Sequence, residues 1–268
     1  MRSYLYVPGD NQKFLDKIAD SEADVIILDL EDSVKLEAKS NAEQMLKDFL
    51  ASTNHPNLLL RVEPSRLKQQ SELINNPKIK KIYLPKSEST QSIQELNSFN
   101  DSNKPIHALI ESASGIEAID QIAKSKNVQS MGIGEADLFA QLSISGQMHP
   151  NIKNYVRSKL VIASSAYDLL PPTAPVNSDF KNLTSFEEET KEFLEMGYWG
   201  RACIHPAQVD IANKVFTPNP ELKARAESII NALEHSNGGA TVDEQGKMID
   251  AAHLKWAKRY LTLEGISL

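Results

Sequence analysis

The sequence predicts a (β/α)₈ barrel, a TIM barrel, followed by a C-terminal helical extension, and three observations support this fold class. Eight short apolar runs alternate with segments that carry the 3.6-residue period of helices. A chain of 268 residues has a normal length for one such barrel. The turn at residues 7–14 lacks the GxGxxG pattern that marks a doubly wound open sheet. We therefore expect the barrel over residues 1–217 and the extension over residues 218–268.

The eight predicted strands are short, and the second is a continuous apolar run bounded by acids, as expected for a strand buried on both faces. Because proline cannot donate a hydrogen bond to a sheet, the seventh run is cut short by its prolines. The strands are expected at residues 3–7, 24–30, 57–62, 80–85, 105–111, 130–134, 168–176 and 201–205.

Between these runs, apolar residues recur with helical spacing, which predicts helices that cover the sheet. Two more helices are expected in the extension, over residues 221–236 and 248–261, with Gly238 and Gly239 as the break. About fifty residues are too few for a core of their own, so we expect the extension to pack on the barrel or on a neighbouring subunit. The barrel helices are indicated by Phe14, Leu15, Ile18 and Ala19, by Ala42, Met45, Leu46, Phe49 and Leu50, by Ile93 and Leu96, by Ile116, Ile119, Ile122 and Ala123, by Val156, Leu160, Ala163 and Tyr167, and by Phe186, Thr190, Phe193 and Leu194.

Composition and charge exclude several classes of protein. The formal net charge of −7 argues against nucleic acid or an anionic membrane surface as the main partner. The single cysteine, Cys203, rules out a disulfide within the chain and suits a reducing compartment. The N-terminus lacks the features of a signal peptide, and no apolar stretch approaches the ~20 residues of a membrane span. We expect a soluble, cytoplasmic protein.

Five of the predicted strands stop on charged residues, and each charged end is followed by a helix-like segment. In a parallel barrel all strands end on one face, and active sites are built there. Although these residues are scattered over more than 100 positions, they are therefore expected to converge on one pocket. They are Glu31 and Asp32, Arg61, Lys86, Glu111 and Asp137.

Glu111 and Asp137 end consecutive strands, so their carboxylates can share one ion. Two carboxylates together with waters and substrate oxygens suit Mg²⁺, which prefers six oxygen ligands and keeps several waters. No His–x–x–His or cysteine-rich spacing indicates zinc. The alternative is that each acid caps the helix that follows it. The spacing alone leaves both interpretations open.

Arg61 can hold a carboxylate or an enolate oxygen through its planar guanidinium. It can equally form an ion pair with Glu63 or Glu31. Glu31 and Asp32 can bind metal waters or orient Arg61, whereas Asp32 or, more simply, Ser33 can cap a helix.

Two further candidates stand at strand ends. Lys86 can meet an anionic group or form a salt bridge across the barrel mouth. His205 directly precedes Pro206, which is a favoured first residue of a helix, so a structural role is expected for this histidine rather than that of a base. Cys203 lies inside an apolar strand, and the sequence shows no serine or cysteine nucleophile arrangement.

Taken together, these segments resemble the citrate lyase β-subunit family of the HpcH/HpaI aldolase superfamily, which includes the malyl-CoA and citramalyl-CoA lyases. The resemblance covers nearly the whole chain, with its motifs in order. Family members are TIM barrels with a C-terminal helical extension, commonly trimers or hexamers, so the resemblance implies a homo-oligomer. The motifs lie in residues 2–18, 24–34, 58–62, 82–89, 110–115, 134–138, 197–209 and 246–253.

The resemblance also implies roles for individual residues. Glu111 and Asp137 match the two acids that bind Mg²⁺, and Arg61 matches the arginine that binds substrate and steadies the developing enolate. Asp250 matches an aspartate that some members lend to a neighbouring subunit as the acid/base. Glu31 and Lys86 are left with supporting roles in substrate binding. Arg2, His205 and Pro206 match regions near the thiol arm of CoA or of an acyl carrier protein.

The implied reaction is a Mg²⁺-dependent cleavage of a 3-hydroxy acyl thioester, such as citramalyl-CoA, malyl-CoA or a citryl thioester, to an acetyl thioester and a 2-oxo acid. Three segments depart from the family pattern: Glu63, residues 141–150 and residues 171–180. Glu63 replaces the usual asparagine and is expected to weaken the hold of Arg61 on an anion. Two alternatives therefore stay open: a CoA-independent aldolase of 2-oxo acids, and a binding protein with a degenerate site.

Overall fold

The computed structural model describes residues 1–235, 239–243 and 245–264. The chain divides into two compact units, Met1–Phe216 and Thr217–Leu268. Gly238, one of the two glycines predicted to break the helices of the extension, lies outside the described residues.

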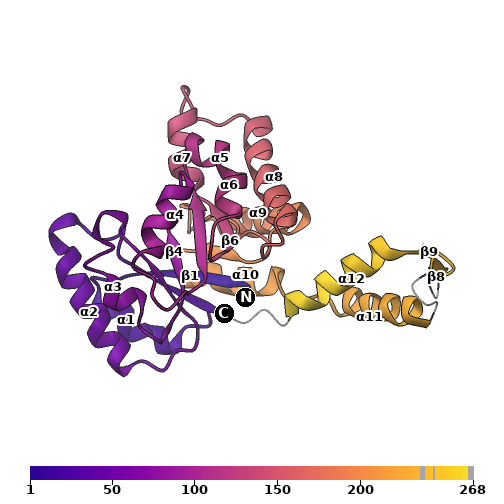
Figure 1. Ribbon diagram of the computed structural model, residues 1–268, viewed down its shortest axis with the longest axis horizontal. Helices are drawn as coiled ribbons and strands as arrows, with labels where there is room; N and C mark the ends of the chain where they lie inside the picture. Colours follow the sequence, from indigo (N-terminus) through magenta and orange to yellow (C-terminus); the bar gives the residue numbers. More distant parts are fainter. Residues whose placement is uncertain (236–238, 244, 265–268) are drawn as a thin grey trace. The chain divides into compact units, whose positions relative to one another are not determined.

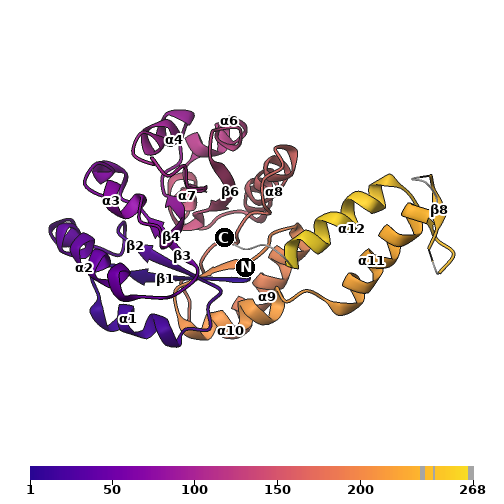
Figure 2. The same ribbon diagram turned by 60° about the horizontal axis from the view of Figure 1, so that its bottom comes forward.

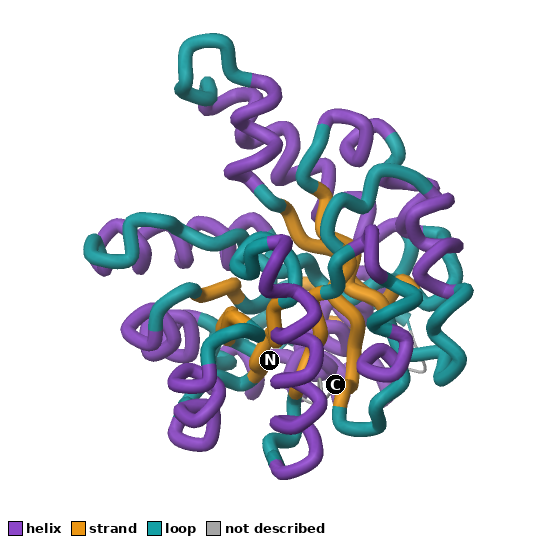
Figure 3. Tube along the Cα trace, turned by 90° about the vertical axis from the view of Figure 1, so that its left-hand side faces the viewer, coloured by secondary structure: helices purple, strands orange, loops and turns teal. Residues whose placement is uncertain are grey.

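The first unit is built on a parallel sheet of seven strands, and its helices surround these strands (Figures 1 and 2). The strands are grouped in the middle of this unit with the helices around them (Figure 3). Their order in the sheet is β6-β5-β4-β3-β2-β1-β7. The strands are β1 (Ser3–Pro8), β2 (Val25–Asp29), β3 (Leu58–Arg61), β4 (Ile79–Leu84), β5 (Ile106–Ile110), β6 (Val128–Ile133) and β7 (Arg201–Cys203). The predicted barrel class is confirmed, and all strands end on the same rim.

The prediction of a seventh strand over residues 168–176 is wrong. This segment makes only isolated bridges, from Thr173 to Gly132 of β6 and from Ala174 to Arg201 of β7. Its prolines cannot donate to a ladder, which explains why no regular strand forms. The two bridges nevertheless lie between the two edge strands, so the segment closes the ring where the sheet itself stops.

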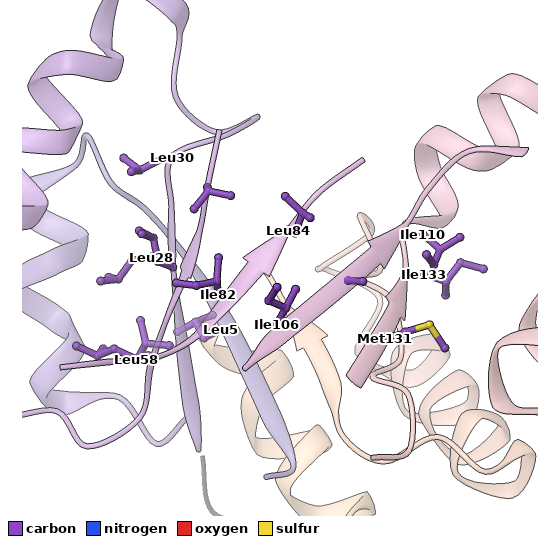
Figure 4. Packing of buried hydrophobic residues seen from close by; sticks show 14 of the residues in the cluster. Leu5, Leu28, Leu30, Leu58, Ile82, Leu84, Ile106, Ile110, Met131 and Ile133 are labelled. Carbon is purple, nitrogen blue, oxygen red and sulfur yellow. The ribbon is translucent and has the colours of Figure 1, made fainter. Parts of the chain in front are cut away.

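Alternation along the strands separates the packing core from the barrel interior. On β2, Ile26 and Leu28 belong to the main apolar cluster that packs under the helices, and both are fully buried. Ile27 and Asp29 alternate with them and therefore face the inside of the barrel. Side chains of this outer cluster, among them Leu58, are shown in Figure 4. Each fully buried leucine or isoleucine contributes roughly 1.5–3 kcal/mol, so this cluster holds the strand ends in place.

Most predicted helix faces are buried as expected, but two predictions are wrong. Phe14 is 49% exposed and Ala19 is exposed as well, while Leu15 and Ile18 of the same predicted face are buried. The single helix predicted around Ile116–Ala123 is split into two at Ala118. The α-helices of the first unit are α1 (Gln12–Asp16), α2 (Lys39–Ser52), α3 (Ser71–Ile74), α4 (Thr90–Asn97), α5 (Ala113–Glu117), α6 (Ile119–Ala123), α7 (Glu135–Leu142), α8 (Pro150–Ala166), α9 (Leu183–Met196) and α10 (Pro206–Val215); 3₁₀ turns cover Lys17–Asp20, Leu36–Ala38 and Pro64–Arg66.

The second unit consists of two helices and a small hairpin. Helix α11 (Pro220–His235) is followed by β8 (Thr241–Val242), β9 (Met248–Ile249) and α12 (Ala251–Glu264). The predicted second helix therefore begins later than expected, because residues 248–249 pair with β8. Contrary to the expectation that this segment has no core, it buries a small cluster of its own: Ala226, Ile229, Leu233, Ile249 and Ala257. Among the described residues, no helix combines the length and apolar character that a membrane span requires.

Candidate active site

A cavity of about 1140 Å³ opens at the C-terminal ends of the barrel strands. Arg61, Glu111 and Asp137 line it. His205 and Pro206 line it as well, from the start of α10. Asp32 lines it too, whereas Glu31 and Lys86 do not line it but contact Arg61 and Glu111, so the strand ends are brought together as the parallel topology requires.

Arg61 is held by a carboxylate that the strand-end analysis did not single out. Its Nε and Nη2 atoms donate to the two oxygens of Asp29, each over 2.6 Å. The two residues are directly paired in the register of β2 and β3, and both are buried. Burial alone would raise the pKa of Asp29, but the hydrogen bonds and the charge of Arg61 hold it below its ordinary value. This fixes the orientation of the guanidinium in the cavity wall.

Glu31 also contacts this guanidinium, whereas Glu63 does not. The Nη1 atom of Arg61 lies 3.0 Å from Glu31 and 3.4 Å from Asp32. Glu63 turns away from Arg61 and forms an ion pair of 2.7 Å with Lys39. The predicted pair of Arg61 with Glu63 is therefore not formed, and Arg61 pairs with Glu31, the other predicted partner. The effect of Glu63 on anion binding stays a prediction.

Neither capping alternative at this end of β2 is found. Lys35 occupies the N-cap position of the following 3₁₀ turn and makes no capping bond. Ser33, the expected cap, instead donates its backbone N–H to Asp29 over 3.4 Å. Asp32 is left at the mouth of the cavity with its side chain half exposed.

Lys86 joins Glu31 to Glu111 through two different groups. Its Nζ atom donates to Glu31 over 2.6 Å, and its backbone N–H donates to Glu111 over 2.5 Å. The φ angle of Lys86 is +50°, which is uncommon for a residue with a side chain. Such backbone strain, roughly 1–3 kcal/mol, persists only where the surrounding structure fixes it. The supporting contact of Lys86 with Glu111 therefore comes from its main chain.

Glu111 is a buried acid with a perturbed pKa. Burial raises its pKa to about 7, and the nearby charges of Glu31 and Asp137 act in the same direction. Gly134 makes room for it, because a Cβ atom there would lie 2.6 Å from the Cβ and 2.7 Å from Oε2 of Glu111. Only glycine leaves this space open, so the start of α7 is shaped around the carboxylate.

The alternative that these two acids cap helices is wrong. Helix α5 is capped by Ser112, whose hydroxyl accepts from the backbone N–H of Gly115 over 3.2 Å. Asp137 lies inside the first turn of α7, and the N-cap position there is Gly134. Both carboxylates are therefore available to a ligand in the cavity.

The arrangement fits Mg²⁺. Within the part of the chain that the structure describes, no group of three or more acidic, histidine or cysteine side chains forms a complete metal cage. Two carboxylates, one of which has its pKa raised by the charge of the other, in a cavity wide enough for substrate and water, are the donor set that Mg²⁺ uses. Glu111 and Asp137 would hold the ion, and the other ligands would be oxygens of water and substrate.

The floor of the cavity is aromatic, which the sequence analysis did not identify. The Arg61 guanidinium lies 4.9 Å from the centre of the Tyr6 ring. Tyr6 packs edge-on against Tyr83, and both line the cavity. Burial raises the pKa of Tyr6 to about 12, so it stays protonated. This floor keeps water away from the inner side of Arg61.

The remaining predicted residues have clear structural partners. His205 caps α10, with its Nδ1 accepting from the N–H of Ala207 over 3.1 Å, as expected for a structural histidine. Arg2 pairs with Asp24 over 2.8 Å at the opposite end of β1, about 20 Å of strand from the rim. The structure does not bring Arg2 to the site.

Asp250 lies in the second unit, where it caps α12. Its side chain accepts from the N–H of Ala252 over 3.0 Å and bonds the His253 ring over 2.8 Å. The hydrogen bond from His253 lowers the pKa of this exposed carboxyl. Its role as an acid/base stays a prediction.

Comparison with known proteins gives consistent findings for sequence and fold. The family model described as HpcH/HpaI aldolase/citrate lyase matches residues 2–206. An L-malyl-CoA/β-methylmalyl-CoA lyase of Rhodobacter capsulatus is 28% identical, over 96% of this chain and 92% of that protein. A (3S)-malyl-CoA thioesterase of Cereibacter sphaeroides is 29% identical, over 97% of this chain and 93% of that protein.

Among solved structures, the CitE protein of Mycobacterium tuberculosis in complex with magnesium, acetoacetate and coenzyme A is similar to this chain. The TM-score is 0.75 with 26% identity, and the match covers 99% of this chain and 98% of that one. RipC of Yersinia pestis is similar with a TM-score of 0.69 and 26% identity, over 82% of this chain and 97% of that one.

Proposed function

Because the chain belongs to the HpcH/HpaI aldolase/citrate lyase family, we propose that it is a Mg²⁺-dependent carbon–carbon lyase acting on a 3-hydroxy acyl thioester. The products are an acetyl thioester and a 2-oxo acid. The observation that carries this proposal is the presence of two metal-competent acids, Glu111 and Asp137, in one cavity with the fixed guanidinium of Arg61. The relative named as a malyl-CoA lyase and the CitE complex with magnesium and coenzyme A support it.

The reaction breaks the bond between C2 and C3 of the acyl chain. The C3 hydroxyl loses its proton, its oxygen becomes the carbonyl of the 2-oxo acid, and the bonding electrons pass to an enolate of the acetyl thioester. When bound, Mg²⁺ would lower the barrier as a Lewis acid toward the substrate oxygens. Glu111 and Asp137 supply its two protein carboxylates, and the strained main chain of Lys86 holds Glu111 in position.

Arg61 stabilises the negative charge that develops on the substrate. An arginine has five N–H donors; Asp29 takes two of them, and Glu31 and Asp32 both contact the Nη1 atom. One N–H on Nη2 is left for a substrate carboxylate or an enolate oxygen at the cavity wall. Because Asp29 fixes the guanidinium before substrate arrives, little reorganisation is needed when charge appears.

A proton must leave the hydroxyl and another must reach the enolate carbon. His205 also lines the cavity, but its ring caps α10, so we do not give it this task. We assign this proton transfer to Asp250, which would reach the cavity from a neighbouring copy of the chain. This assignment requires a homo-oligomer, which we propose to be a trimer or a hexamer. We also propose that the enzyme is cytoplasmic. The thioester carrier is CoA or an acyl carrier protein, and His205 and Pro206 line the side of the cavity where its thiol arm would enter.

The proposal is tested in the condensation direction. The protein is incubated with Mg²⁺, acetyl-CoA and pyruvate, glyoxylate or oxaloacetate in turn, and the acyl thioesters are identified by mass spectrometry. A condensed 3-hydroxy acyl thioester is expected with at least one acid, and it should disappear with EDTA or in Glu111→Gln. The absence of turnover with every acid, in both directions, would refute the proposal.

A second candidate is hydrolysis of the thioester, which is favoured by the relative named (3S)-malyl-CoA thioesterase. Hydrolysis gives a free thiol and a hydroxy acid, so the same products analysis separates it from cleavage of the carbon–carbon bond. A CoA-independent aldolase would not be inhibited by CoA esters, and the substitution Asp250→Ala would leave its activity unchanged.

A further inference from the structure

Four charged side chains form a largely buried chain of ion pairs that begins at the cavity wall, and we call them the closure network: Glu135 of α7, Arg157 of α8, Glu189 of α9 and Arg201 of β7. Arg157 forms a bidentate pair with Glu135, in which its Nη2 lies 2.8 Å from Oε2. The same Nη2 lies 3.0 Å from Glu189, which also pairs with Arg201. The two arginines are only 3% and 0% exposed.

The closure network lies where the sheet is interrupted. Residues 168–176 form no regular strand, but backbone hydrogen bonds join them to both neighbours, among them Thr173 N–H to Met131 over 3.1 Å and Ala174 N–H to Gly200 over 2.9 Å. Arg201 donates from Nε to the carbonyl of Pro175 over 3.1 Å, and Asn177 donates to Glu189 over 3.3 Å. Side-chain contacts from the network therefore add to the backbone hydrogen bonds that hold this irregular segment.

The geometry of the network depends on guanidinium groups. The Arg157 guanidinium lies 4.1 Å from the centre of the Phe193 ring, and that of Arg201 lies 4.0 Å from the Phe186 ring. Planar groups can stack on a ring and bind a carboxylate through two parallel bonds, and a lysine cannot do both. Breaking a buried pair leaves an uncompensated charge, so each member constrains the others.

Glu135 connects this network to the metal acids. It is the first residue of α7, two positions before Asp137, and it lines the cavity. The preceding residue, Gly134, packs against the side chain of Glu111. The N-cap residue, Gly134, donates its backbone N–H to the carbonyl of Ile110 over 2.9 Å, and the pair of Glu135 with Arg157 adds a side-chain anchor for this first turn. A displacement of Glu135 would move the backbone beside both metal acids.

We propose that Arg157 and Glu189 are positioning residues of the metal site. Through Glu135 they fix the first turn of α7 and thereby set Asp137 and Glu111 at the separation that one divalent cation requires. This inference rests on the proposed function only in taking those two acids as the metal ligands. It assigns a task to residues outside the coordination shell, which touch neither the ion nor the substrate.

The test compares metal binding by Arg157→Lys with that by the wild-type protein. Mn²⁺ affinity is measured by isothermal titration calorimetry and by electron paramagnetic resonance, well below the melting temperature of each variant. We expect Arg157→Lys to weaken Mn²⁺ binding by about tenfold or more. Arg66→Lys is the matched control, because Arg66 forms a comparable bidentate pair with Glu43, at 2.8 Å and 2.8 Å, away from α7. This control should change Mn²⁺ affinity by less than about twofold.

The inference is overturned if Arg157→Lys lowers the melting temperature but binds Mn²⁺ within twofold of wild type, or if Arg66→Lys weakens binding equally. If Arg157→Lys does not fold, Mn²⁺ binding is measured with Glu189→Gln instead. This variant keeps the pair between Arg157 and Glu135 and removes the negative charge of Glu189 that Arg157 also contacts. Weaker Mn²⁺ binding by Glu189→Gln supports the inference, and unchanged binding refutes it. If wild type binds Mn²⁺ no better than Glu111→Gln, the proposed metal site itself has failed.

Discussion

Glu111 predicts a steep pH dependence of metal binding near neutrality. Burial, with the charges of Glu31 and Asp137, raises its pKa from 4.5 to about 7. Only the carboxylate binds Mg²⁺, so a proton competes with the metal for the same group. With a pKa of about 7, the apparent Kd is about tenfold larger at pH 6 than at pH 8. With an ordinary pKa, the same change of pH would alter the Kd by only a few per cent.

The same shift has a consequence for stability. A carboxyl whose pKa is raised on folding favours the protonated form, so the metal-free protein loses stability as the pH rises from 4.5 through about 7. The rise in the pKa of Glu111 bounds this loss at about 3 kcal/mol. Mg²⁺ holds the carboxylate ionised and should remove the loss, so the stabilisation by Mg²⁺ is expected to grow with pH over this window.

Isothermal titration calorimetry at pH 6, 7 and 8 measures the affinity directly. Repeating the titration at pH 7 in two buffers of different ionisation enthalpy gives the number of protons released, which should be about one half per Mg²⁺. Glu111→Gln serves as the control, because it removes the titrating group. A Kd that stays within twofold between pH 6 and pH 8, without proton release at pH 7, would refute the reasoning about Glu111.

Three further predictions follow from the contacts around Arg61 and Glu111. Gly134→Ala should weaken Mg²⁺ binding by about tenfold or more in calorimetry, because the added Cβ occupies the space of the Glu111 side chain. Asp29→Asn should lower the free energy of unfolding by about 3 kcal/mol in urea and reduce kcat/KM, since it leaves the charge of Arg61 without its bidentate partner; an unchanged urea midpoint would contradict this. Glu63→Gln should leave kcat/KM within about twofold of wild type, because Glu63 does not contact Arg61; a larger change would show that its carboxylate reaches the substrate.

The sequence predicted which charged groups reach the rim, because strand order and direction decide this. Glu111, Asp137 and Arg61 follow buried apolar runs, and in a parallel barrel every such end opens on the same face. The rule of strand ends does not indicate Asp29, because this residue lies inside the apolar run of its strand. An acid in an otherwise fully buried strand requires a cation, and Arg61 holds the matching position on the next strand, so the signal was present.

Side-chain directions beyond the strand ends could not be predicted in the same way. Glu63 is two residues from Arg61 in sequence, but its partner, Lys39, comes from a helix that only the folded structure brings near. Lys86 supports Glu111 through a main chain at positive φ, which no residue preference indicates for a lysine. The pair of Arg157 with Glu135 likewise joins two helices whose contact depends on tertiary packing.

The irregular parts of the fold were the hardest to predict. The prolines at positions 171, 172 and 175 indicated a shortened strand, and the structure retains only one bridge on each side of the segment. In the second unit, Met248 and Ile249 fit a helical period but pair with β8 instead, since Asp250 starts the helix as a cap. In both places local hydrogen bonding overrides the apolar pattern.

The most direct test of the central claim is the stoichiometry of products when the protein consumes the thioester found in the condensation assay. With Mg²⁺ present, we predict one acetyl thioester and one 2-oxo acid for each thioester consumed, without release of free thiol. The reaction should be lost in Glu111→Gln. Release of a free thiol with an intact hydroxy acid, or cleavage that continues at the same rate in EDTA, would contradict it.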